Sequence, residues 1–111
     1  MYELIHALIG LLSSFCKAKG IKLLFGITPL KNQLDFESSS ELIDFDLPHK
    51  KFRSILDDYN IRYIDTTSEM KIEHKKSPVI FPDGHLNKHG HYFLSELVVK
   101  ELNRLNWLNH E

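Results

Sequence analysis

The chain has 111 residues, 42% of them hydrophobic and 26% charged, which leaves room for one domain (residues 1–111) and excludes a disordered tail. Fourteen Lys and Arg residues stand against fifteen Asp and Glu residues, so the chain lacks the positive field that nonspecific nucleic-acid binding requires. The single cysteine, Cys16, cannot form an internal disulfide, so stability has to come from an ordinary apolar core. We expect one globular domain with no nucleic-acid partner.

The longest strongly apolar stretch, residues 4–15, is the candidate for a transmembrane helix or a signal peptide. It is interrupted by polar and glycine residues and is shorter than the roughly 20 residues that span a bilayer. The charge before it is Glu3, no Lys or Arg precedes it, and no small-x-small cleavage site follows. These features predict no membrane span and no signal peptide, and by default a cytoplasmic location.

The first part of the chain reads as a helix, a strand and a long connection. Apolar residues recur at three- and four-residue spacings over residues 2–15, before a basic turn and a glycine stop at Gly20. Residues 21–28 are nearly continuously apolar and end at a proline, which predicts a strand covered on both faces, as in parallel sheets. Residues 31–47 are polar and mixed, and we expect a connection there with room for one helical turn.

The second part contains two more helical patterns. A proline opens a helix over residues 48–59, and residues 61–65 follow as a short strand. Residues 66–77 are charged and have no sustained period, so they are predicted to be loop. Residues 78–82 form a short extended piece between two prolines, and helical spacing returns over residues 87–107.

The order helix, strand, helix, strand, helix predicts an α/β layered fold with a small parallel sheet. Only two strands are convincing, while a continuously apolar strand requires neighbours along its edges and helices on both faces. We therefore interpret the chain as part of a larger sheet. Sheet edge and helix surface are left uncovered in that interpretation, so self-association is expected.

The densest polar cluster lies just before the last helix and reads Asp83-Gly-His85-Leu-Asn87-Lys-His-Gly90-His91. Asp83 and His85 are two residues apart, so in an extended loop their side chains fall on the same side. A carboxylate there can fix the imidazole tautomer and stabilise its protonated form, as a base serving a hydroxyl nucleophile requires. Asn87 is placed to cap the final helix, and Gly90 would let another backbone approach its first turn.

Other interpretations of these residues stay open. Asp83 can be a turn residue beside histidines that are merely exposed. The cluster can also be a metal site, because His85, His89 and His91 together with Asp83 supply imidazole and carboxylate ligands within nine residues. A third class of function is a non-catalytic interaction module, in which the apolar face of the helix over residues 2–15 and an unpaired sheet edge dock a partner.

The run over residues 83–99 resembles the C-terminal block of the SGNH (GDSL-like) hydrolases, in the branch that reads Asp-x-His-x-Asn-x-x-Gly-His before an amphipathic helix. Residues 20–31 and 60–65 are similar to the two strands that precede this block. The resemblance implies a flavodoxin-like three-layer fold and ester or acyl hydrolysis by a Ser-His-Asp triad. It also implies that His85 is the general base and Asp83 its orienting partner.

Two departures from the family pattern limit the expected activity. One residue separates Asp83 from His85, where many members have two, and no Gly-Asp-Ser occurs in the sequence. The blocks with the nucleophilic serine and the oxyanion donors are absent, so the chain resembles the C-terminal half of such an enzyme. We expect little or no hydrolysis from it alone. Completed by an N-terminal half, it would act on an ester or an acylated carbohydrate or lipid, with no cofactor and no metal.

Overall fold

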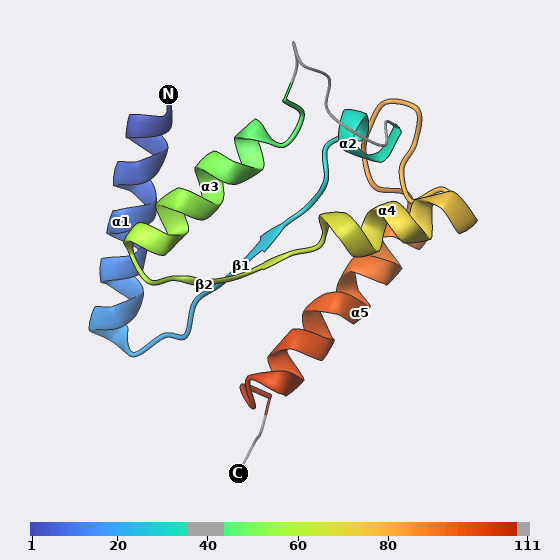
Figure 1. Cartoon of the computed structure of the whole chain (residues 1–111). Helices are drawn as coiled ribbons and strands as arrows, with labels where there is room; N and C mark the ends of the chain where they lie inside the picture. The colour runs from blue at the N-terminus through green and yellow to red at the C-terminus, as the bar shows by residue number, and fades with distance from the viewer. Residues whose placement is uncertain (36–43, 109–111) are drawn as a thin grey trace.

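The computed structural model describes residues 1–35 and 44–108. In chain order (Figure 1) the elements are α1 (Tyr2–Lys19), β1 (Leu24–Ile27), α2 (Lys31–Asp35), α3 (Leu47–Asp58), β2 (Arg62–Asp65), α4 (Thr67–Lys76) and α5 (Lys88–Arg104). The two strands pair in parallel, with Leu24 opposite Arg62 and Ile27 opposite Asp65. The predicted α/β class with a small parallel sheet is confirmed.

The first helix ends where its sequence predicts. Gly20 adopts left-handed backbone angles, φ 67° and ψ 27°, which glycine tolerates without strain. The N–H of Ile21 then donates to the carbonyl of Cys16 at 2.8 Å and so satisfies one of the last carbonyls of α1. This tight stop turns the chain directly into β1, which is shorter than the predicted strand over residues 21–28.

Helices α1 and α3 lie on one side of the two strands, and α5 lies on the other (Figure 1). A first core cluster joins α1, β1, α3 and the residue before β2, and its buried members are Ile9, Ile27, Ile55, Leu56 and Ile61. Burial of such side chains contributes roughly 1.5–3 kcal/mol each, so this cluster fixes the two helices against the sheet.

A second core cluster lies away from the strands and supports the segment before α5. Its buried members are Leu34, Met70, Val79 and Ile80. The radius of gyration is 15.6 Å, larger than the about 13 Å expected of a compact domain of this length. The two core clusters are therefore separate, and the fold is less compact than a single central core would make it.

The structure corrects the prediction that residues 66–77 are loop, because residues 67–76 form α4. Only Met70 of this helix is buried, so the segment has little of the periodicity by which helices are recognised. Packing of Met70 into the second cluster stabilises the helix in spite of its polar composition.

The connection over residues 31–47 and the extended piece over residues 78–82 can also be compared with the structure. Within the connection over residues 31–47, the predicted helical turn is α2, and residues 36–43 lie outside the described part of the chain. The extended piece over residues 78–82 contains Ile80, which pairs with Leu86 as an antiparallel bridge. No helix among the described residues is long and apolar enough to cross a membrane.

Candidate functional site

Residues 78–87 form a loop that leaves the second core cluster and returns to the start of α5. The bridge between Ile80 and Leu86 closes its base, and the N–H of Phe81 donates to the carbonyl of His85 at 2.8 Å. These backbone contacts leave residues 82–84 as the turn of the loop. The motif residues therefore stand on a short hairpin-like segment that the core holds in place.

The junction between this loop and α5 explains why the motif contains an asparagine and a glycine. The side-chain oxygen of Asn87 accepts the N–H of Gly90 at 2.8 Å, and its amide nitrogen donates to the carbonyl of Pro78, also at 2.8 Å. A Cβ atom on Gly90 would overlap the carbonyl oxygen of Val79. The predicted cap at Asn87 and the predicted close backbone approach at Gly90 are both confirmed.

Asp83 and His85 form the predicted side-chain contact. Oδ1 of Asp83 lies 3.1 Å from Nδ1 of His85, and the same oxygen accepts the backbone N–H of His85 at 3.0 Å. Asp83 is thus both a turn residue and the partner of the His85 imidazole, and it makes both contacts through the same carboxylate oxygen. The side chain of Asp83 is 67% exposed and that of His85 is 83% exposed. Water therefore competes with the contact between them and weakens it.

The pKa of the Asp83 carboxyl is lowered, first because the backbone N–H of His85 donates to it and second because the imidazole does. We expect His85→Ala to raise the pKa of Asp83 only part of the way to its ordinary value, because the backbone donor remains. An NMR pH titration of the Asp83 carboxyl carbon measures this, with His91→Ala as the matched control. A pKa that is equal in His85→Ala and in the unmodified chain would mean that the imidazole contact does not form in solution.

The lowered pKa of Asp83 also determines how the contact changes the stability of the fold with pH. Folding lowers the pKa of Asp83, so the contact favours the folded state at pH values above the ordinary aspartate range. This contribution is lost as the pH falls through the lowered folded-state pKa. At neutral pH the Asp83 carboxyl is therefore ionised, the form in which it accepts the hydrogen bonds of His85.

The remaining histidines of the cluster do not join this pair. Nε2 of His89 lies 2.8 Å from Oε1 of Glu73 and ties α5 to α4, while His91 is exposed on α5. Within residues 1–35 and 44–108, no group of three or more His, Cys, Asp and Glu side chains is placed to hold a metal ion. Of the four ligands proposed for a metal site, Asp83 and His85 therefore contact each other, whereas His89 and His91 lie apart from them.

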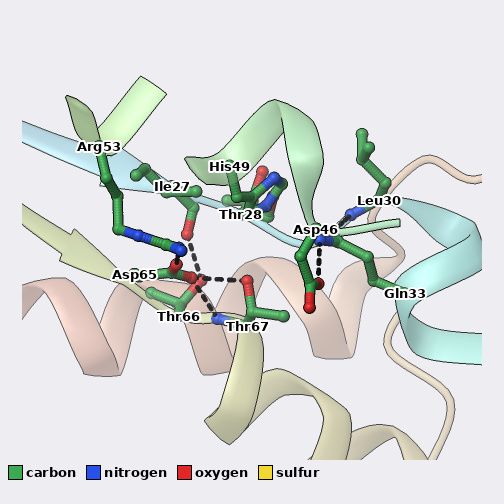
Figure 2. A network of polar contacts seen from close by, with 10 residues as sticks. All are labelled: Ile27, Thr28, Leu30, Gln33, Asp46, His49, Arg53, Asp65, Thr66 and Thr67. Atoms are coloured by element: carbon green, nitrogen blue, oxygen red, sulfur yellow. Dashed lines mark hydrogen bonds and ion pairs between the residues drawn. The ribbon is translucent and has the colours of Figure 1, made fainter. Parts of the chain in front are cut away.

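A polar network that the sequence analysis did not identify lies where the two parallel strands end (Figure 2). Arg53 of α3 donates to Oδ2 of Asp65 at 2.6 Å, and the hydroxyl and N–H of Thr67 donate to Oδ1 at 2.6 and 3.0 Å. Burial alone would raise the pKa of Asp65, but the donors from Thr67 and Arg53 outweigh it and lower the pKa. The buried His49 donates through Nε2 to the carbonyl of Thr28 at 2.8 Å.

Two buried side chains of the same network fasten the loops that follow the strands (Figure 2). The hydroxyl of Thr66 donates to the carbonyl of Ile27 at 2.8 Å. Gln33 accepts the N–H of Leu30 at 2.7 Å and donates to Asp46 at 3.0 Å, which ties α2 to the start of α3. A signal for this network was present, because Asp65 is the last residue of a strand and two threonines follow it. Sites in α/β proteins gather at the carboxyl ends of parallel strands.

The Asp83–His85 loop lies against the start of α2. A Cβ atom on Gly84 would be 3.6 Å from Cβ of Lys31, the first residue of α2, which follows the end of β1. No described serine directly follows either strand, since threonines occupy those positions. The described serines lie in or at the ends of helices, and they are Ser13, Ser14, Ser54, Ser68, Ser77 and Ser95. Ser38, Ser39 and Ser40 lie outside the described residues.

No model of a known protein family matches the chain, and no curated protein or solved structure matches it. The resemblance to the SGNH hydrolases therefore rests on the sequence block over residues 83–99 alone.

Proposed function

We propose that Asp83 and His85 are the acid–base part of an SGNH-type hydrolytic site, whose nucleophilic serine and oxyanion donors come from polypeptide outside these 111 residues. The observation that carries the proposal is the 3.1 Å contact between Oδ1 of Asp83 and Nδ1 of His85, in a loop whose turn lies against Lys31 at the start of α2. Asn87 and Gly90 support it, because they build the loop-to-helix junction that presents the pair.

The chemistry assigned to the pair follows from its geometry. With Nδ1 facing the carboxylate, Nε2 is the nitrogen that would accept the proton of a serine hydroxyl as its oxygen attacks an ester carbonyl carbon. Asp83 would stabilise the resulting imidazolium. The same proton would then pass from Nε2 to the leaving alkoxide as the tetrahedral intermediate collapses. Water would attack the acyl-enzyme in a second cycle with His85 again as the base.

The geometry also supports the expectation that the chain alone is inactive. The imidazole of His85 is 83% exposed, so it lacks the water-excluded surroundings in which preorganised donors lower an acyl-transfer barrier. Removal of a triad member costs an enzyme about 10⁴-fold or more in kcat. A base without nucleophile or oxyanion donors is therefore expected to add little to buffer hydrolysis.

The experiment that tests the proposal co-expresses the chain with the product of the reading frame immediately upstream of its own. We expect turnover of p-nitrophenyl acetate by the pair but not by the chain alone. His85→Ala should then lower kcat by about 10⁴-fold or more, whereas His91→Ala should leave kcat within about twofold. Turnover by the isolated chain that disappears in His85→Ala would instead mean that a serine within the 111 residues serves as nucleophile.

An interaction module is the second candidate, and one observation favours it. The exposed side of α1 carries large apolar side chains, among them Leu4, Leu8 and Leu11. Exposed apolar groups that adjoin one another are typical of protein-binding surfaces. Failure of the co-expressed pair to hydrolyse any ester, together with a stable complex between the two polypeptides, would favour this second candidate.

A further inference from the structure

The side of α1 that faces away from the sheet carries an apolar stripe, the strongest feature of the molecule that the proposed hydrolytic site does not use. The stripe consists of large side chains that are between 41% and 69% exposed, namely Leu4, Leu8, Leu11, Leu12 and Phe15. Figure 1 shows α1 at the margin of the fold, with α3 along its inner side. The inner side of α1 also carries apolar residues, because Ile9 belongs to the first core cluster and Ile5 packs against it.

The spacing of the stripe indicates what kind of structure covers it. Residues 4, 8, 11 and 15 follow one another at intervals of four, three and four, the alternation of a coiled-coil seam. Side chains with this spacing interlock with a second helix that crosses at about 20°. A helix, rather than a strand or a small molecule, is therefore the structure that fits the stripe.

We propose that the stripe binds the α1 helix of a second copy of this chain, in an antiparallel pair. No charged residue interrupts the stripe from Leu4 to Phe15, so two copies bring no like charges together along it. Glu3 lies in the first turn of α1, and Lys17 and Lys19 lie in the last. An antiparallel pair places the acidic end of each helix beside the basic end of the other and opposes the two helix dipoles, whereas a parallel pair aligns like charges.

The size of the stripe sets the expected strength of the pair. Five side chains that are about half exposed offer on the order of 400 Å² of apolar surface per copy. A stable interface of standard size buries about 800 Å² per partner, so the pair is expected to be weak. We expect a dissociation constant on the order of 10–100 µM.

Sedimentation equilibrium of the full chain tests this proposal. The apparent mass should rise from the 13.0 kDa of one chain toward twice that value as the concentration increases from about 1 to about 500 µM. Leu8→Glu and, separately, Leu11→Glu should each raise the dissociation constant by about tenfold or more. Both positions are more than half exposed, so the helix content and the melting temperature measured at low concentration should change little.

The matched control is Ile72→Glu, which places the same charge at a 59% exposed apolar position of α4. It should leave the dissociation constant within about twofold. The proposal is overturned if the chain stays monomeric throughout the concentration range, or if Ile72→Glu weakens self-association as much as Leu8→Glu. Ester hydrolysis by the co-expressed pair is measured separately, so failure of the self-association proposal can be distinguished from failure of the hydrolase proposal.

Discussion

Gly90→Ala is expected to lower the free energy of unfolding by about 3 kcal/mol, a large part of the total stability of a small domain. The added Cβ would overlap the carbonyl oxygen of Val79, lie 3.0 Å from the carbonyl carbon and 3.1 Å from Cδ2 of Leu86. Two of these atoms belong to the backbone and cannot rotate away. A shift of Val79 would also weaken the hydrogen bond that its carbonyl accepts from the N–H of Asn87.

Gly26→Ala is the matched control for this substitution, and urea unfolding followed by circular dichroism measures both. A Cβ atom on Gly26, in β1, meets no atom within 4 Å, so we expect a change within about 0.5 kcal/mol. If Gly90→Ala were as mild as Gly26→Ala, the loop would not be held against the first turn of α5. The Asp83–His85 pair would then lose the support that presents it.

The elements that could be predicted are those whose signals are local. The stop of α1 at Gly20 requires only a residue that tolerates a left-handed conformation, and the cap of α5 at Asn87 requires only a side-chain oxygen near its first N–H groups. The contact between Asp83 and His85 is equally local, because two residues around a glycine turn bring both side chains to one side. Each of these features was readable without knowledge of the rest of the chain.

The features that could not be predicted depend on residues far apart in the sequence. His89 is paired with Glu73 of α4, a helix that the sequence did not indicate, so the metal interpretation could not be tested before the fold was known. Likewise, Arg53 reaches Asp65 only because α3 packs beside the end of β2. The position of a strand end predicts that polar side chains gather there, but the packing of the helices decides which of them pair.

Met70→Ala should lower the free energy of unfolding by about 3 kcal/mol and the melting temperature by roughly 10 °C or more. The side chain of Met70 is fully buried and packs with Leu34, Val79 and Ile80, so its removal leaves a cavity lined by apolar groups. The substitution tests the helix that the sequence analysis interpreted as loop. A methionine in a solvated loop would tolerate alanine at almost no cost.

Ile72→Ala on the same helix provides the control, since Ile72 is 59% exposed and its truncation should change stability by no more than about 0.5 kcal/mol. Thermal unfolding gives the size of both effects, and amide hydrogen exchange shows where they act. We expect Met70→Ala to accelerate exchange in α4 and around Val79, because the second core cluster supports both. Equal stability of the two variants would mean that α4 is not anchored by Met70, and that the base of the Asp83–His85 loop is held by the bridge between Ile80 and Leu86 alone.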